Sequence, residues 1–481
     1  MNVPLCRPEN PDGLQSKAAP APRKRRRVQA LDAFRGMTVM NMILVDNAGG
    51  AYPVIDHSPW NGVSLADMTM PMFDFIVGCS VALAFSKLDK TKSEAKWVAL
   101  RKAWWRFVKL FLLGIWNQGG YNMFQYDMTH LRIMGILQRV AVCYLIAAVI
   151  EIYGDTCCMS SRKTRNTLSS THAAVFKRSV NHWVGIVALC SIWTCIMYGV
   201  TTPSEYNETC VRGKFTPACN PQRLVDAALF GVDHMYFPTN GGNADGRGMT
   251  FNRLPQCSSC SPGLCLEPRN MTALNPWCGK VPFDPEGIVS QLTAAAGTLT
   301  GVYIGKVLVE FNEETHRQRM NHWLVFAFSF ISLGIVLHAT AWMPLNTDLF
   351  SLSFLLVTSG TGAALLSFWY LLIDVWQFKK VAAPFIWVGK NAVVMYIAAE
   401  AGIIQWCLSI FYWDGDTKNN LSNILWPGSV WGVESSLNER FENTLKDPHD
   451  KLYVLVWTLG YILIWVGVAW WMDRQKWYIS I

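Results

Sequence analysis

A histidine and two carboxylates interrupt the first apolar part of the sequence. They are Asp46, His57 and Asp67. Ionisable side chains inside apolar stretches are costly to bury, so they usually face a cavity or a charged partner. A carboxylate that binds one ring nitrogen of a histidine fixes its tautomer and raises its basicity, which suits a general base or a nucleophile. These residues predict a catalytic site in which His57 reacts, Asp67 orients it, and Asp46 polarises the site or binds an amine.

Two other interpretations of these residues stay open. A lone histidine at a membrane interface is more often a simple anchor. Asp67 and Asp74 are seven residues apart and therefore share one face of a helix. This stripe of carboxylates suits the wall of a pocket, but it equally suits a proton relay that Asp46 and Glu400 would complete. The relay predicts a proton-coupled secondary transporter of a small amine or acid.

Basic and amide side chains form a second set of candidates. Lys102, Arg106 and Lys109 follow a spacing of i, i+4 and i+7, which places them on one helix face, although their long stems can also reach lipid headgroups. Arg139 lies inside an apolar stretch and needs a counter-ion, and arginine is well suited to phosphate. A nucleotide-bearing anion meets this need better than a metal, because no regular set of His and Cys ligands is visible. The candidates for binding such an anion are Arg106, Arg132, Gln138, Arg139 and Asn391.

Membrane-spanning helices have to position these side chains. Hydrophobic residues make up 51% of the 481 residues and charged residues only 16%, whereas soluble domains carry about 25% charged residues. The composition therefore excludes an ordinary soluble enzyme and a disordered chain. Apolar stretches long enough to cross a bilayer lie at 36–55, 66–86, 103–120, 133–153, 183–200, 286–308, 322–343, 349–373, 384–409 and 452–472. We predict an all-α polytopic membrane protein with about ten transmembrane helices.

The segments between these stretches predict how the chain is oriented in its membrane. Lysine and arginine are abundant at 87–102, 162–178 and 379–380 and near the C-terminus, and basic segments stay on the cytosolic side. Both termini are therefore expected in the cytosol. The basic run Arg23–Arg27 resembles a nucleic-acid-binding patch, but its place before the first apolar stretch favours a membrane flank. We expect no nucleic-acid partner, and no cleavable signal peptide in the polar, proline-rich start.

Residues 201–285 form the longest segment on the opposite side of the membrane. They hold six of the 14 cysteines, which are Cys210, Cys219, Cys257, Cys260, Cys265 and Cys278. Six cysteines in an extracytoplasmic loop predict up to three disulfides. The Cys257-x-x-Cys260 spacing also allows zinc, but no regular second pair follows it. Glycosylation sequons begin at Asn207, Asn270 and Asn420, which agrees with a lumenal position.

These observations divide the chain into six parts. We expect a disordered cytosolic segment at 1–28, five membrane helices with the active site at 29–200, a cysteine-rich, glycosylated lumenal loop at 201–285, membrane helices six to nine at 286–409, a second lumenal loop at 410–451, and the last membrane helix with a cytosolic C-terminus at 452–481.

The chain also carries a specific order of motifs. The clearest are Ala30-Leu31-Asp32-Ala33-Phe34-Arg35-Gly36, His57-x-x-Trp60-Asn61-Gly62, Arg132-Ile133-x-Gly135-Ile136-Leu137-Gln138-Arg139 and Asp284-Pro285-Glu286-Gly287-Ile288. With shorter matches at Asn346, Asn391, Tyr396 and Glu400, they cover nearly all of the chain after residue 28. The set resembles the transmembrane N-acetyltransferase family of lysosomal heparan-alpha-glucosaminide N-acetyltransferase.

This resemblance implies transfer of acetyl from cytosolic acetyl-CoA to the terminal glucosamine of heparan sulfate in the lysosomal lumen. It implies that His57 is the active-site histidine and Asp67 its supporting carboxylate. It further implies a lysosomal, vacuolar or other endomembrane location, with acetyl-CoA as donor substrate and no metal. The chain departs from the family at Asp46, where the family has Asn, and at Ala399, where the family has His. These departures bear on the acceptor more than on the donor.

Several alternatives stay open from the sequence. His57 can accept a proton from an amine near neutral pH, or it can carry the acetyl group itself in a ping-pong route. The rival functions are the transporter and a non-catalytic scaffold whose cysteine-rich loop binds a partner, which the costly intramembrane charges disfavour. The oligomeric state is open as well, with a homodimer among the alternatives.

Overall fold

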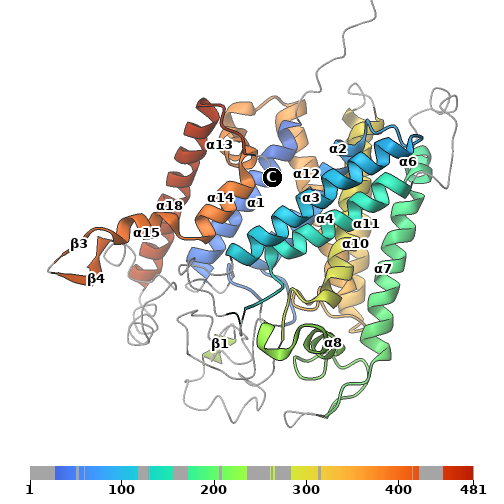
Figure 1. Cartoon of the computed structure of the whole chain (residues 1–481), viewed down its shortest axis with the longest axis horizontal. Helices are drawn as coiled ribbons and strands as arrows, with labels where there is room; N and C mark the ends of the chain where they lie inside the picture. Colours follow the sequence, from blue (N-terminus) through green and yellow to red (C-terminus); the bar gives the residue numbers. More distant parts are fainter. Residues whose placement is uncertain are drawn as a thin grey trace, which may run out of the picture.

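The computed structural model of the chain is built mainly from α-helices (Figure 1). It describes residues 28–49, 52, 54–58, 60–117, 128, 131–154, 172–204, 209–235, 260–261, 264–265, 283–311, 316–413, 415–421 and 448–479. The helices are α1 (Gln29–Ala48), η2 (Ala66–Met68), α2 (Thr69–Phe85), α3 (Ser93–Asn117), α4 (Ile136–Tyr153), α6 (His172–Arg178), α7 (Val180–Gly199), α8 (Pro221–Phe230), η5 (Val232–His234), α10 (Ile288–Glu310), α11 (His316–Ala339), α12 (Leu352–Tyr370), the π-helical turn η9 (Leu371–Val375), α13 (Lys379–Lys390), α14 (Ala392–Glu400), α15 (Ile403–Ser409) and α18 (Pro448–Arg474). The short strands are β1 (Cys260–Ser261), β2 (Leu264–Cys265), β3 (Tyr412–Trp413) and β4 (Asp416–Asn420), which pair as two antiparallel hairpins.

The helices fit a multi-pass membrane protein, so the predicted fold class is confirmed. Within the described ranges, seven helices are long and apolar enough to cross a membrane, and the bent pair α13 and α14 makes an eighth. α1 and α3 have 20 and 25 residues, but they fall outside this group because they carry more charge. All ten predicted apolar stretches therefore coincide with helices, while fewer than ten satisfy a strict test of length and hydropathy.

The stretch at 384–409 is broken rather than one continuous helix. α13 and α14 meet at an angle of 71°, and Gly402 has a positive φ of 62° before α15 begins. The buried side chain of Asn391 lies at the first break, where its Nδ2 donates to the carbonyl of Trp477 (3.0 Å) and its Oδ1 accepts the amide of Ile479 (3.1 Å). These bonds use the C-terminal segment to hold the chain where the helical ladder is interrupted.

α10 lies at the centre of the bundle, and nearly all of its residues are buried. It packs against α2 at very short range through glycines on both helices. A Cβ added to Gly301 would lie 2.2 Å from the carbonyl oxygen of Phe75, and one added to Gly78 would lie 1.9 Å from that of Thr298. Small residues allow helix backbones to approach closely, so this contact depends on the absence of side chains.

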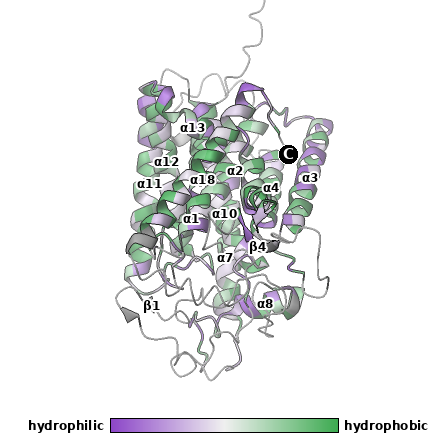
Figure 2. Ribbon diagram, turned by 90° about the vertical axis from the view of Figure 1, so that its left-hand side faces the viewer, coloured by the Kyte–Doolittle hydropathy of each residue, from purple (hydrophilic) through white to green (hydrophobic). Residues whose placement is uncertain are grey.

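The molecule has two ends, which we name after helices that lie there. α6 and the turn between α2 and α3 lie at the α6 end, and α8 lies at the opposite α8 end (Figure 1). Figure 2 shows the helices running between the two, with α8 and β1 below them. The Cys210–Cys219 disulfide precedes α8 and is one bridge among the six cysteines for which up to three were expected.

The other predicted features of the large loop are described only in part. Cys257 and Cys278, like the sequon residues Asn207 and Asn270, lie outside the described residues. The third sequon residue, Asn420, ends strand β4 opposite Tyr412 and is only 8% exposed.

A buried ion cluster ties helices together at the α6 end. Glu151 of α4 accepts a hydrogen bond from Lys90 at 2.9 Å and pairs with His182 of α7 at 2.7 Å and with Lys306 of α10 at 3.1 Å. Glu151 is 3% exposed, and several cations therefore share one buried carboxylate. The α6 end is thus rich in positive charge both inside and on its connecting segments.

Candidate active site

His57 and Asp67 form a hydrogen-bonded pair at the α8 end. The Nδ1 atom of His57 lies 2.8 Å from Oδ1 of Asp67. Asp67 is 1% exposed in the turn η2, whereas the side chain of His57 is 47% exposed. Because Nδ1 faces the carboxylate, Nε2 is the ring nitrogen that faces away from Asp67 and can exchange a proton with a ligand.

Hydrogen bonds to both carboxylate oxygens hold Asp67 in place. Its second oxygen, Oδ2, accepts the backbone amides of Ser58 (3.0 Å) and Ser64 (2.9 Å) and the hydroxyl of Ser64 (3.0 Å). Three donors on one oxygen and the imidazole on the other leave this carboxylate one orientation. The pair is thus arranged to fix the tautomer and the position of the histidine ring.

The segment that carries His57 is irregular but well anchored. The amide of Gly62, which has a φ of 127°, donates to the carbonyl of Leu345 at 2.8 Å. Asn346 Nδ2 reaches Asn61 Oδ1 at 3.3 Å. Trp60 is 2% exposed, and its indole Nε1 donates to the carbonyl of Phe215 at 2.7 Å. These bonds attach the segment to the disulfide-bonded loop and to the turn before α12.

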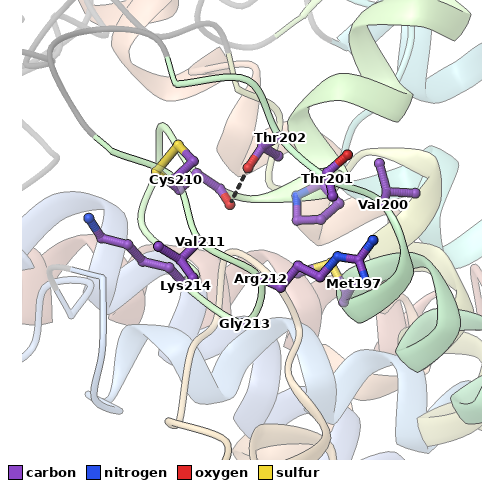
Figure 3. Close-up of a pocket in the computed structure, with 11 residues that line it drawn as sticks. Met197, Val200, Thr201, Thr202, Cys210, Val211, Arg212, Gly213 and Lys214 are labelled. Carbon is purple, nitrogen blue, oxygen red and sulfur yellow. Dashed lines mark hydrogen bonds between the residues drawn. A yellow bond between two sulfur atoms is a disulfide. The ribbon is translucent and has the colours of Figure 1, made fainter.

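A small pocket adjoins this segment in the disulfide-bonded loop. It has a volume of about 230 Å³ and is lined by Met197 and Val200 at the end of α7, by Arg212 and by the Cys210–Cys219 bridge (Figure 3). His57 and Asp67 are not among its lining residues. It is therefore a neighbour of the dyad rather than part of it.

Arg132 and Arg139 bind carboxylates and carbonyls at the α8 end. Arg132 makes a two-pronged ion pair with Asp284, with distances of 3.1 and 2.6 Å, and it also contacts Glu286. Arg139, which is 3% exposed, donates to the carbonyl of Pro285 at 2.5 Å and to the hydroxyl of Ser290 at 2.8 Å. Both arginines therefore fix the segment that leads into α10.

Two further carboxylates lie within the electrostatic reach of His57. Burial raises the pKa of Glu286, but the neighbouring Arg132 and Arg139, with His57, more than offset this and hold that pKa below its usual value. Burial and the charge of Asp67 raise the pKa of Asp348 to about 7, although His57 opposes the shift. Glu286 and Asp348 therefore both interact electrostatically with the imidazole of His57.

The predicted site residues do not all lie in one place in the structure. Asp46 and Glu400 lie close enough to the hydroxyl of Tyr396 to act on it electrostatically, together with Glu286 and Arg132, so Asp46 is near the α8-end cluster. Asn391, by contrast, stabilises the break between α13 and α14 through backbone bonds to the C-terminal segment. A direct role for it in binding a donor stays a prediction.

Arg106 and Gln138 lie between α3 and α4. The guanidinium of Arg106 is 4.7 Å from the centre of the Tyr144 ring. Gln138 is fully buried, and neither atom of its amide has a partner among the described residues. A buried amide without partners costs about 1–3 kcal/mol, so a polar ligand at this position would be favourable.

Sequence reasoning missed Glu286 and Asp348 as site residues. Glu286 stands in a motif that the sequence made visible, but only its approach to Arg132 reveals its relation to His57. Asp348 has no sequence signal, because it lies far along the chain in a short turn. Within the described part of the chain, no three His, Cys, Asp or Glu residues gather as a metal site would require.

Comparison with known proteins agrees with this geometry. Residues 27–193, which include His57 and Asp67, match the family described as heparan-alpha-glucosaminide N-acetyltransferase, catalytic. The predicted family resemblance is confirmed. The mouse heparan-alpha-glucosaminide N-acetyltransferase is 26% identical over 421 residues and the human protein 24% over 423 residues, each alignment covering 83% of this chain.

The chain spans 58% of the length of the mouse relative and 57% of the human one. The matched region is described as catalytic, and both relatives are named heparan-alpha-glucosaminide N-acetyltransferase. Because the chain covers only part of these relatives, its activity, donor, acceptor and location are proposals.

Proposed function

We propose that this chain is a transmembrane acetyltransferase that moves acetyl from acetyl-CoA to the amino group of a glucosamine-type sugar. The observation that carries the proposal is the hydrogen bond of 2.8 Å between His57 and an Asp67 that three other donors immobilise. A half-exposed imidazole on a buried, fixed carboxylate suits proton transfer or nucleophilic attack. The names of the relatives support the choice of an amino-sugar acceptor.

In the direct route, Nε2 of His57 removes a proton from the acceptor ammonium. The neutral amine then attacks the thioester carbonyl, and the C–N bond forms. The C–S bond breaks, and the departing thiolate of CoA takes up the proton that the new amide nitrogen loses. In the ping-pong route, Nε2 attacks the thioester carbonyl and CoA leaves as its thiolate. The neutral amine then attacks the acetyl-imidazole, the C–N bond to Nε2 breaks, and the new amide nitrogen gives up a proton. Asp67 serves both routes because the imidazole carries positive charge during each.

The distribution of charge supports separate ends for the two substrates. Four carboxylates, Asp67, Asp284, Glu286 and Asp348, lie in the surroundings of His57, so this site suits a cationic amine. The phosphates of CoA are better matched by the α6 end, where Lys87, Lys90, Lys92, Lys96, Arg101 and Lys102 are found.

Arg106 and Lys109 extend this basic series along α3 toward its C-terminal end. We therefore assign the donor phosphates to the basic end and to Arg106. Arg132 and Arg139, which were candidates for the phosphates, instead support the carboxylates beside His57.

The same distribution supports a cytosolic α6 end and a lumenal α8 end, since basic connections remain in the cytosol. We propose that the protein resides in a lysosomal, vacuolar or related endomembrane with both termini cytosolic. Acetyl-CoA is then drawn from the cytosol, and the acceptor is lumenal.

The test is transfer of labelled acetyl from acetyl-CoA to glucosamine by the purified protein in detergent. We expect product with the wild type and none above background with His57→Ala. His316→Ala, which removes a histidine of α11 that contacts Tyr370 of α12, is the matched control and should retain activity. Full activity in a folded His57→Ala protein would exclude this mechanism. Proton-coupled uptake of an amine without acetyl-CoA would instead establish the transporter.

A further inference from the structure

Three segments that are distant in sequence meet around His57. Gly62 and Asn61 are hydrogen-bonded to Leu345 and Asn346, as described above. Gln222 of α8 joins the other two segments, because its Nε2 lies 3.2 Å from the carbonyl of Asp284 and 3.4 Å from that of Asp348. The network brings residues 284–286 and 345–348 to the same side of the molecule as the dyad.

Glu286 and Asp348 are the carboxylates that this network presents to His57. Glu286 is positioned by its contact with Arg132 and by its own amide, which donates to Asp284 Oδ1 at 3.0 Å. Its side chain remains 15% exposed. Both carboxylates interact electrostatically with the imidazole of His57 and with one another.

The same region is short of hydrogen-bond donors. Gln222 is fully buried between the two segments, and its Oε1 accepts no hydrogen bond from the described residues. Buried acceptors without donors are unfavourable, so a ligand rich in N–H or O–H groups would stabilise this region.

We infer that Glu286 and Asp348 are the residues that recognise the acceptor, by binding its primary ammonium group beside His57. The inference rests on the acetyltransferase function proposed above and names the specificity residues of that site. A primary ammonium has three donors and no acceptor, and here it meets two carboxylates and one imidazole. Glu286 and Asp348 hold two of its protons while His57 removes the third, which leaves a neutral amine with a free lone pair.

This arrangement distinguishes an amine from its acetylated product. An amide nitrogen carries no positive charge, and acetylation leaves it a single proton, so the product loses the attraction of both carboxylates. The same carboxylates repel the phosphates of the donor, which keeps the two substrates in their own parts of the molecule. The site therefore selects amino sugars by charge and releases N-acetylated sugars.

The test compares Asp348→Asn with the wild type, because Arg132 pairs with Asp284 and Glu286 and this change leaves both pairs intact. We expect the KM for glucosamine to rise tenfold or more while the KM for acetyl-CoA stays within twofold. Direct binding of glucosamine and of N-acetylglucosamine, measured without donor, should show a wild-type preference for the amine that Asp348→Asn loses. Glu286→Gln should act in the same direction.

Two controls keep the inference open to refutation. Asp89→Asn removes a carboxylate between α2 and α3 that accepts a bond from Thr91 at 2.6 Å, and it should leave the KM for glucosamine unchanged. Asp348→Glu keeps the charge and should restore part of the affinity if Asp348→Asn folds poorly. A wild type that transfers acetyl but binds both sugars equally, or an Asp348→Asn protein with unchanged KM for glucosamine, would overturn this inference alone. A wild type that transfers no acetyl would overturn the proposed function as well.

Discussion

At the scale of single residues, the pairing of His57 with Asp67 combines an accessible ring with an inaccessible support. The imidazole is half exposed, whereas the carboxylate is buried and receives hydrogen bonds on both oxygens. The histidine can therefore meet a substrate without losing its orientation. The backbone amides of Ser58 and Ser64 can only donate hydrogen bonds. Much of the support of Asp67 therefore comes from the backbone.

Asp67→Asn should lower kcat by about 10²–10⁴, which is the usual contribution of a positioned acid or base. An amide retains the size of the carboxylate but lacks its charge, and it must turn an NH₂ group toward either His57 or the Ser58 and Ser64 amides. The measurement is kcat for acetyl transfer to glucosamine. Ser64→Ala removes a single donor and should cost less than tenfold. Equal losses in the two variants would show that Asp67 acts only through local folding.

At the scale of elements, glycine contacts and buried carboxyls determine how helices meet. α2 and α10 touch backbone to backbone at Gly78 and Gly301, and α1 and α13 do the same at Gly36 and Gly389. α8 is joined to the start of α10 by Asp226, whose Oδ1 accepts the amide of Ile288 at 2.8 Å. These contacts hold α2 against α10. Asp67 lies just before α2, and Glu286 lies just before α10.

Gly301→Ala should lower the free energy of unfolding by about 1–3 kcal/mol, the usual cost of overpacking. The new methyl group would lie 2.2 Å from the carbonyl oxygen of Phe75, which belongs to backbone that cannot turn aside. Thermal unfolding in one detergent measures the effect as a lower Tm. Gly467→Ala in α18, which meets nothing within 4 Å, is the matched control and should be neutral or slightly stabilising. Similar Tm values for the two variants would contradict the close packing.

Asp226→Asn should reduce the dependence of stability on pH. Burial and the nearby Asp284 raise the pKa of Asp226 from 3.8 to about 8, so the folded protein keeps its proton where the unfolded chain loses it. Stability from this group is thus present at low pH and is lost as pH rises from about 4 to about 8. An asparagine keeps the acceptor for Ile288 and carries no charge. We expect Tm to fall less between pH 5 and pH 8 in the variant than in the wild type, and parallel profiles would refute the assignment.

At the scale of the whole molecule, the two ends differ in charge. Lysines and arginines gather at the α6 end, where Glu151 serves several cations at once, and carboxylates surround His57 at the α8 end. An anionic donor and a cationic acceptor would therefore approach from opposite sides. Such a division suits transfer of a small acyl group across a membrane that neither substrate crosses.

Sealed vesicles of uniform orientation test this division directly. With the α6 end facing outward, labelled acetyl-CoA added outside should acetylate glucosamine enclosed inside. Vesicles of the opposite orientation should give no product until they are made permeable. Equal rates in both orientations would refute transfer across the membrane. His57→Ala vesicles control for leakage and for spontaneous acetylation.

The sequence alone was enough to predict the helical membrane architecture and the His57–Asp67 pair. Hydropathy is a local property, so apolar stretches of about 20 residues reveal helices without knowledge of their neighbours. His57 and Asp67 are ten residues apart, and their meeting needs only one tight turn. The broken stretch at 384–409 was less predictable, because the bonds that hold Asn391 come from residues 477 and 479.

Tertiary structure alone decided what the other charged residues do. Arg132 looked like a phosphate ligand by its type, but its partners lie 152 and 154 residues away. Asp348 lies near His57 only because its turn is hydrogen-bonded to Asn61 and Gly62. The physical reason is that a charge acts through its nearest neighbours in space. In a helical bundle, those neighbours are set by which helix ends meet, and no local pattern of residues records that choice.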